Sequence, residues 1–287
     1  MSFLLSWLIL SQIYALAALS TNLLVGVIGI FSVSQAAIFG VGAYTVALLT
    51  VSNTVPFPFA VLAAMAICGG LNVLWSLPSL RLWGDYFVIT SFGSQIVATS
   101  VFINWSELTA GAAGITGIPG PVLFGHEIVE PAEFLVFSTV VLILASVSFW
   151  LLMHSPFGRT IDAIRQDESA VLAAGKDVLR AKLSVSAISG VYAGLGGVLF
   201  ATFIAYIDPT SFDIHVSVLI LTMLVVGGAR TLAGSIVGPF LLMALPQALA
   251  YVDVPSTIAG PLRQLLYGVL LVAFMLFRPQ GIAGRRL

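Results

Sequence analysis

The stretch that decides the fold runs from residue 2 to residue 49 and reads SFLLSWLILSQIYALAALSTNLLVGVIGIFSVSQAAIFGVGAYTVALL. It contains no Asp, Glu, Lys, Arg or His, and the first charged residue of the whole chain is Arg81. A backbone crosses hydrocarbon only when its hydrogen bonds close within the segment, as they do in a helix. We therefore expect helices of about 20 apolar residues that span a membrane.

The rest of the chain has the same character. Of its 287 residues, 59% are hydrophobic and 8% are charged, whereas a soluble domain carries about 25% charged residues. We predict one membrane domain, residues 1–287, with an all-α fold: a polytopic bundle of about nine spans. Two of these segments, the one around Gly26 and Gly29 and the short 215–228, are expected to be discontinuous. The apolar segments are 4–29, 34–52, 57–79, 86–105, 134–153, 183–205, 215–228, 232–251 and 262–277.

The basic residues predict the orientation. They gather in residues 154–182 and at the C-terminus, whereas the loop 106–133 has four Glu and no Lys or Arg. Because cytoplasmic loops are rich in Lys and Arg, the first two regions are expected in the cytoplasm, and the loop and the N-terminus outside. The C-terminal basic residues are Arg278, Arg285 and Arg286, and Arg81 is expected on the same cytoplasmic side.

Residues 155–182 carry a cytoplasmic amphipathic pattern. Pro156 and Gly158 end the preceding span, and Ile161 and Ile164 then recur at helical spacing among charged positions. Gly175 allows a sharp turn before the next span. Two interpretations fit this pattern: a solvated connector that lies on the membrane surface, or a helix that docks a cytoplasmic partner.

Polar side chains inside the spans mark candidate residues of a translocation pathway, because a polar atom in hydrocarbon is costly unless it is paired or wet. One cluster lies where a span is expected to break, and the second lies on or beside one face of a helix. The alternative is ordinary hydrogen bonding within and between helices, with close packing at glycines. The candidates are Ser32, Ser34, Gln35, Tyr44, Tyr86, Thr90, Ser94 and Gln95.

Two glycine-rich stretches lie between spans. ELTAGAAGITGIPGP, residues 107–121, is either a shaped external surface or a floppy connector. GGARTLAG, residues 227–234, is expected to be a simple cytoplasmic turn, in which Arg230 follows the preference for basic residues on that side. The chain has no GxxxxGK[ST] loop, so we expect no ATP site of that kind.

The segment GRTIDAIRQDESAVLAAG, residues 158–175, resembles the coupling segment in the permease subunits of Liv-type ABC importers of branched-chain amino acids. Leu172 stands where that family usually has an acidic residue, and Ala113 where it usually has a polar one. The resemblance covers nearly the whole chain and is greatest to the LivM-like branch. Further blocks are NLLVGVIGIFSVSQAAIFGVGAYTVALL (22–49), LRLWGDYFVITSFG (80–93), VVGGARTLAGSIVGP (225–239) and LLYGVLLVAFMLFRPQG (265–281).

The resemblance implies a multi-pass permease of the bacterial inner membrane. Its partners are expected to be a second, LivH-like permease, two cytoplasmic ATPase subunits that use ATP, a periplasmic substrate-binding protein and membrane lipid, but no nucleic acid. The chain itself is expected to be no enzyme and to hold no cofactor, metal or catalytic residue. In the implied ATPase-coupling segment, Ile161 and Ile164 form an apolar anchor in a groove of the ATPase. The other coupling residues are Gly158, Arg159, Arg165, Asp167, Glu168 and Gly175.

Two matters stay open. The implied substrates are branched-chain or other hydrophobic amino acids, but related permeases carry urea, short amides or aromatic acids. A self-sufficient secondary transporter or channel is a further alternative, although such a protein would need ionisable residues well inside the spans. An intramembrane enzyme would need a cluster of acidic or His residues there, and the acidic residues of this chain lie in its loops.

Overall fold

The computed structural model describes residues 2–52, 55–79, 85–123, 126–250, 256–277 and 280–284. In these ranges each of the nine predicted apolar segments forms a helix, so the all-α fold is confirmed. The long helices are α1 (Ser2–Thr21), α2 (Gln35–Val51), α3 (Phe57–Ser79), α4 (Asp85–Asn104), α6 (Pro131–His154), α9 (Val178–Ile204), α10 (Ile214–Gly227), α11 (Leu232–Ala250) and α12 (Ser256–Phe277).

Short elements connect these helices. A π-helix, η1 (Asn22–Ile28), continues α1, and two short helices, α7 (Pro156–Gln166) and α8 (Glu168–Ala173), join α6 to α9. The remaining elements are α5 (Ser106–Thr109), η2 (Gly111–Ala113), β1 (Ile115–Thr116), β2 (Val122–Leu123), β3 (His126–Glu127), β4 (Tyr206–Ile207) and η3 (Pro209–Phe212).

Not every long helix is a full span. Five are long and apolar enough to cross a membrane, and a sixth span results if α10 and α11, which meet at an angle of 119°, count as one bent pair. The helix α2 and the apolar part of α12 are shorter. The polytopic bundle is thus confirmed, as are the breaks near Gly29 and after residue 227, while the number of nine crossings stays a prediction.

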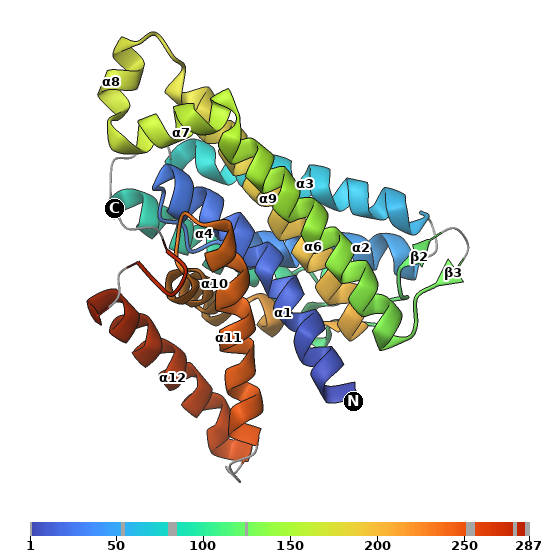
Figure 1. Ribbon diagram of the computed structural model, residues 1–287. Helices are drawn as coiled ribbons and strands as arrows, with labels where there is room; N and C mark the ends of the chain where they lie inside the picture. The colour runs from blue at the N-terminus through green and yellow to red at the C-terminus, as the bar shows by residue number, and fades with distance from the viewer. Residues whose placement is uncertain are drawn as a thin grey trace.

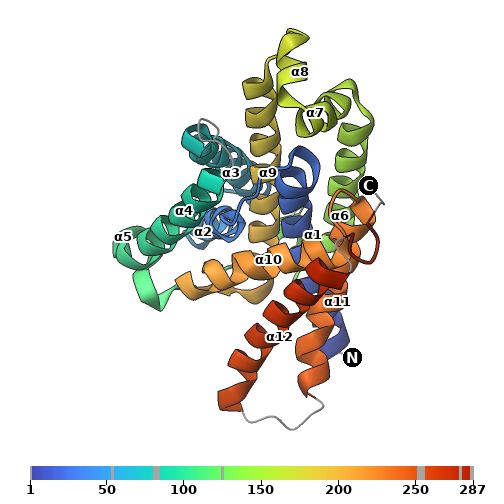
Figure 2. The same cartoon turned by 90° about the vertical axis from the view of Figure 1, so that its left-hand side faces the viewer.

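The helices α1 and α9 form the centre of the bundle (Figures 1 and 2). The helix α9 packs against α2 and α3 on one side and α1 on the other, and α1 also packs against α6 and α11. Most of the apolar stretch 4–28 is therefore buried against protein. A helix that is apolar all round is expected in either setting, in lipid or inside a large core.

Glycines let the central helices approach closely, as expected for a membrane bundle. A Cβ on Gly197 would lie 1.9 Å from the carbonyl oxygen of Phe39, so α2 and α9 meet there almost backbone to backbone. A Cβ on Gly42 would lie 2.5 Å from the carbonyl oxygen of Gly194. No side chain fits at either crossing.

The two informative loops lie at opposite ends of α6, which is about 36 Å long at 1.5 Å per residue. Figure 1 shows β2 and β3 at one end of α6 and α7 and α8 at the other. Gln12 in α1 hydrogen-bonds to Ser138 and Thr139 near the start of α6. The N-terminus therefore lies at the same end of the bundle as the loop 106–133 (Figure 1). This relative arrangement fits the predicted topology. The orientation stays a prediction, and Arg81, Arg278, Arg285 and Arg286 lie outside the described residues.

The described part of the loop 106–133 is held in place by hydrogen bonds. Strand β1 pairs antiparallel with β4, and the N–H groups of Gly117 and Ile118 both donate to the carbonyl of Ala205, at 3.1 and 3.3 Å. Two acidic residues nearby cap helices: Asp208 accepts from the N–H of Ser211, and Asp213 from that of Val216. The loop is therefore a shaped surface and not a floppy connector.

Candidate functional site

The break between η1 and α2 is the centre of the polar cluster. Gly29 ends η1 with φ +81°, a left-handed conformation that glycine adopts without strain. Residues 30–34 follow outside any helix. The first N–H groups of α2 have no partner within the helix. Side chains from other helices bind them instead: Ala36 N–H donates to Ser217 Oγ and Ala37 N–H to Gln95 Oε1, both at 3.0 Å.

Gln95 is buried at this break and connects three elements, while its role in a pathway stays a prediction. Its Oε1 accepts from Ala37 and from Ser217 Oγ, and its Nε2 donates to the carbonyl of Phe212 at 2.8 Å. Ser91, one helical turn away on α4, accepts from the N–H of Val33 at 3.1 Å. Helices α2, α4 and α10 are thus joined at a single side chain.

The predicted residues Ser32, Ser34 and Gln35 are buried at the break. Ser32 and Ser34 share a hydrogen bond of 3.1 Å, and Gln35 Oε1 accepts from Ser20 Oγ at 2.7 Å. The Nε2 of Gln35 is buried without a hydrogen-bond partner. So is the hydroxyl of Tyr44, which lies nine residues further along α2 with its ring against Phe102 and Phe212. Orphaned buried donors are rare in proteins, so these two groups are available to a polar ligand or to water.

The structure does not bring the other predicted pathway residues to this cluster. Tyr86 is 66% exposed on the outer face of α4. The hydroxyls of Thr90 and Ser94 each donate to the carbonyl four residues earlier in the same helix, both at 2.9 Å. These three residues therefore lie on a surface that is open in the single chain, and their role stays a prediction.

The helices α7 and α8 are short and sharply capped. Ser155 caps α7 by accepting from the N–H of Gly158 at 3.2 Å, and a Cβ on Gly158 would lie 2.5 Å from the carbonyl oxygen of Leu152. Asp167 caps α8 by accepting from the N–H of Ala170 at 3.1 Å. This bond and a second one from the Ser169 hydroxyl lower the pKa of Asp167. Gly175 turns the chain back with φ +76°, as predicted.

The two residues expected to form an apolar anchor on α7 are buried within the chain itself, and their predicted contact with an ATPase stays a prediction. Ile161 is 0% and Ile164 4% exposed, because both pack into the core of the chain and hold α7 against the bundle. On α8 it is Val171 that is buried, whereas Leu172 is 55% exposed. Leu172 and, at the start of α9, Leu179 with 48% exposure are the large apolar side chains of residues 155–182 that remain exposed. A helical pattern predicts a buried face but not which molecule covers it.

The charged residues that were predicted to couple to an ATPase differ in their surroundings. Glu168 forms an ion pair of 2.7 Å with Lys182 at the start of α9, so it holds α8 in place. Arg159 and Arg165 are exposed and line a cavity on the bundle side of α7. A Cβ on Gly29 would lie 3.3 Å from Cγ of Arg165, so α7 touches the end of η1.

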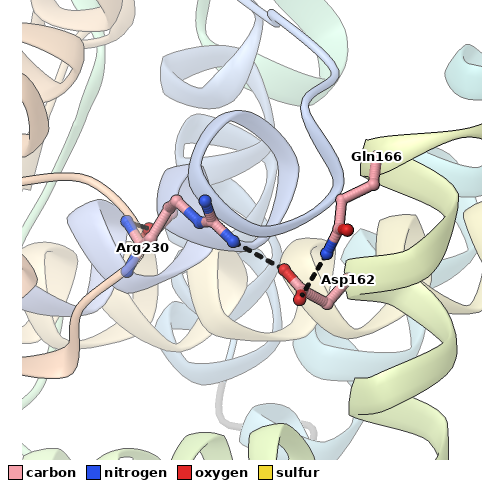
Figure 3. Close-up of polar contacts among 4 residues, drawn as sticks. Asp162, Gln166 and Arg230 are labelled. Atoms are coloured by element: carbon pink, nitrogen blue, oxygen red, sulfur yellow. Dashed lines mark hydrogen bonds and ion pairs between the residues drawn. The ribbon is translucent and has the colours of Figure 1, made fainter. Parts of the chain in front are cut away.

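The contact between α7 and the turn 228–231 was not predicted. An Arg230 guanidinium nitrogen lies 2.6 Å from Oδ1 of Asp162, and Gln166 donates to the other oxygen of Asp162 at 3.1 Å (Figure 3). The Arg230 N–H donates in turn to Oδ1 of the buried Asn22 at 2.8 Å. Asn22 Nδ2 donates to the carbonyl of Thr231 at 3.1 Å and to Ser235 Oγ at 2.8 Å.

Asn22 and Arg230 therefore join three regions that are far apart in the sequence: the start of η1, the turn between α10 and α11, and α7. The sequence carried a signal in Asn22, an amide in the middle of an apolar stretch, but nothing that indicated its partner. Arg230 is more than the simple basic flank of a turn that the sequence predicted.

Comparison with known proteins identifies the family of the chain. A family model described as "Branched-chain amino acid transport system / permease component" matches residues 3–275. The chain belongs to this permease family. Escherichia coli LivM, a "high-affinity branched-chain amino acid transport system permease protein", is 30% identical over 296 residues, which cover 95% of this chain and 68% of LivM.

Other relatives are more distant. Escherichia coli LivH is 21% identical, with 96% of this chain and 92% of LivH covered. The ribose import permease protein RbsC of Bacillus subtilis is 25% identical, with 73% of this chain and 56% of RbsC covered. The resemblance to LivM is thus confirmed. No solved structure matches the chain.

In this permease the buried polar side chains are neutral. Among the residues whose burial the structure describes, those buried are Ser, Thr, Asn and Gln, and no Asp, Glu, Lys or Arg is among them. Within the described ranges no three His, Cys, Asp or Glu side chains gather as they would around a metal ion. The chemistry available at the break is therefore hydrogen bonding to neutral or zwitterionic groups.

Proposed function

We propose that the chain forms half of the translocation pathway of an ABC importer, in the inner membrane and beside a second, LivH-like permease. Two cytoplasmic ATPase subunits hydrolyse ATP, and a periplasmic binding protein delivers the substrate. Membership of the permease family and the identity to LivM support this function. The concentration of basic residues between 154 and 182 supports an orientation with α7, α8 and the C-terminus in the cytoplasm and the N-terminus outside.

The proposed substrates are branched-chain or other hydrophobic amino acids, as the printed name of LivM says of that protein. The polar cluster at the break supports a substrate without net charge, because its members are hydroxyls and amides. The free donors of Gln35 and Tyr44 suit a carboxylate or carbonyl oxygen. Urea, short amides and aromatic acids remain alternatives, and the sugar permease RbsC is a reminder that this family is broad.

A self-sufficient secondary transporter or channel is the weaker alternative. Secondary transporters couple to ions or protons through ionisable residues near the middle of the membrane. The buried polar residues of the described chain are neutral, so the driving force is proposed to come from the ATPase subunits.

The single observation that carries the proposed mechanism is the chain of contacts from α7 to the break. When the ATPase subunits move α7 and α8, Asp162 pulls on Arg230, and the Arg230 backbone is bound to Asn22 at the first residue of η1. Arg165 touches Gly29 at the other end of η1. A displacement of α7 is thus delivered to both ends of the π-helix that precedes the break, which is a type of helix frequent at functional sites.

The contact with the ATPase is proposed at the exposed tip of the segment, residues 167–175 with Leu172 in its centre. Gly158 and Gly175 set the turns, Ile161 and Ile164 attach α7 to the bundle, and the caps at Ser155 and Asp167 keep both helices short and rigid. A rigid segment transmits a displacement that a flexible one would absorb.

The experiment is affinity capture of the tagged chain from its native membrane in mild detergent, with mass spectrometry of the proteins that come with it. We expect ATPase subunits and a second permease. The variant Leu172→Arg should lose the ATPase subunits and keep the second permease, because a charge replaces the exposed apolar contact. Val129→Arg, also at an exposed apolar residue but at the opposite end of α6, is the matched control. A chain that is captured alone, or equal recovery of ATPase with Leu172→Arg, would contradict the proposal.

A further inference from the structure

A cavity of about 740 Å³ lies between the last two turns of α6, the helix α7 and the turn that carries Arg230. One wall is apolar and comes from α6, with Phe149, Trp150 and Met153. The opposite wall is charged and holds three guanidinium groups, those of Arg159, Arg165 and Arg230, against the one carboxylate of Asp162. The cavity therefore carries an excess of positive charge beside an apolar surface.

Only one of the three arginines is neutralised. Asp162 binds Arg230 at 2.6 Å, and neither Arg159 nor Arg165 has an ion-pair partner among the described residues. Partial burial and the nearby Arg230 charge both lower the pKa of Arg165, while Asp162 raises it. Two guanidinium groups without ion-pair partners that line the same cavity favour a bound anion, and phosphate is one of the anions that arginine binds through two parallel hydrogen bonds.

An apolar groove continues the cavity along the outside of the bundle. It has a volume of about 310 Å³, lies between α6 and α11, and shares Trp150 and Leu232 with the cavity. Apart from Ser146, its lining is apolar, and Ile143 and Val147 on its wall are exposed in the chain. Because these residues belong to spans, the groove opens toward hydrocarbon and suits an acyl chain.

We propose that the cavity and groove together bind one anionic phospholipid, with its phosphate between Arg159 and Arg165 and an acyl chain in the groove. Basic pockets between spanning helices on the cytoplasmic side are typical sites of anionic lipid headgroups. An acidic side chain of the ATPase would satisfy the arginines but would leave the groove empty, and the proposed ATPase contact at Leu172 is on α8. The bound lipid would link α6 to α7 and hold Arg165 beside Gly29.

The test measures phospholipid bound to the purified chain by native mass spectrometry, without substrate or ATP, so its outcome does not depend on the proposed transport. The chain is equilibrated with phosphatidylglycerol or with phosphatidylcholine in mild detergent. We expect about one phosphatidylglycerol per chain and far less phosphatidylcholine. In the double variant Arg159→Gln with Arg165→Gln, the affinity for phosphatidylglycerol should fall by a factor of roughly ten or more. Arg180→Gln, an exposed arginine that does not line the cavity, is the matched control.

A second pair of variants separates a lipid from a free phosphate. Val147→Trp fills the groove, and Val140→Trp on the same helix is its control, since both valines are 49% exposed and only Val147 lines the groove. A lipid site predicts that Val147→Trp weakens phosphatidylglycerol binding and Val140→Trp does not. Equal binding of both lipids, full binding by the double arginine variant, or inorganic phosphate as an efficient competitor with no effect of Val147→Trp would each overturn the proposal. So would cross-linking of the variant Arg165→Cys to an ATPase subunit through its thiol.

Discussion

Arg230 has a backbone conformation that an arginine adopts only at a cost. Its φ of +71° lies in the left-handed region, which costs most residues other than Gly and Asn roughly 1 kcal/mol. Its ion pair with Asp162 is partly exposed, and exposed pairs contribute about 0.2–1 kcal/mol. Stability alone therefore does not explain an arginine at this position, and a glycine would fold at least as well.

We therefore predict that Arg230→Gly separates stability from function. The variant loses the contact with Asp162 but relieves the backbone, and the N–H that binds Asn22 remains. We expect an unchanged or slightly higher melting temperature in detergent, together with a loss of most ATP-driven uptake. Scanning fluorimetry and vesicle uptake measure the two quantities. Wild-type uptake by Arg230→Gly would show that the contact with α7 carries no motion.

Asp167 predicts a dependence on pH. Hydrogen bonds from Ser169 and Ala170 lower its pKa in the folded protein, so the cap of α8 is intact above the unfolded pKa of about 3.9 and is lost as the pH falls through the lower folded value. At neutral pH, Asp167→Ala should fray α8 and speed amide exchange in residues 168–173, whereas Asp167→Asn should keep the cap. Exchange that is equally slow in Asp167→Ala would contradict the role of this cap.

At the scale of elements, the central interface is made by backbone and not by large side chains. The helices α2 and α9 cross at Gly42 and Gly197, where a Cβ would meet a carbonyl oxygen of the other helix. In lipid there is little hydrophobic force between helices, so this close packing is a main source of their association.

The substitution Gly197→Ala should therefore destabilise the bundle, because its Cβ would lie 1.9 Å from the Phe39 carbonyl oxygen and the helices must separate. The expected loss is about 1–3 kcal/mol, typical of overpacking. Gly70→Ala in α3 is the control, since nothing lies within 4 Å of its Cβ, and it should be neutral or slightly stabilising. Thermal unfolding in detergent measures both, and equal melting temperatures for the two variants would contradict the packing argument.

The helices could be predicted well from the sequence, but what each helix packs against could not. Each apolar segment is a helix, because a helix closes the backbone hydrogen bonds within a single segment, as lipid requires. The pattern did not indicate that α1 is surrounded by protein or that Ile161 and Ile164 face the bundle. An apolar side chain is compatible with lipid, with the core and with a partner, so its chemistry does not distinguish them.

At the scale of the whole molecule, the predicted polar cluster and the coupling segment are connected by residues that the sequence could not join. Ser32, Ser34 and Gln35 were predictable because a break in a helix leaves backbone N–H and C=O groups without helical partners, and polar side chains gather there. The contact of Asn22 with Arg230 spans 208 residues, and that of Arg230 with Asp162 spans 68. Such pairs depend on how the helices pack, which one sequence does not specify.

The central claim is that α7 drives the break through Asp162 and Arg230. The most direct measurement is uptake of leucine per ATP hydrolysed in vesicles that contain the captured complex and its binding protein. Wild type is compared with Asp162→Arg, Arg230→Asp and the variant with both changes. We predict that each single variant hydrolyses ATP but takes up at least about tenfold less leucine per ATP, since repulsion replaces the ion pair, and that the double variant recovers part of the uptake. Wild-type uptake per ATP in both single variants would contradict the account.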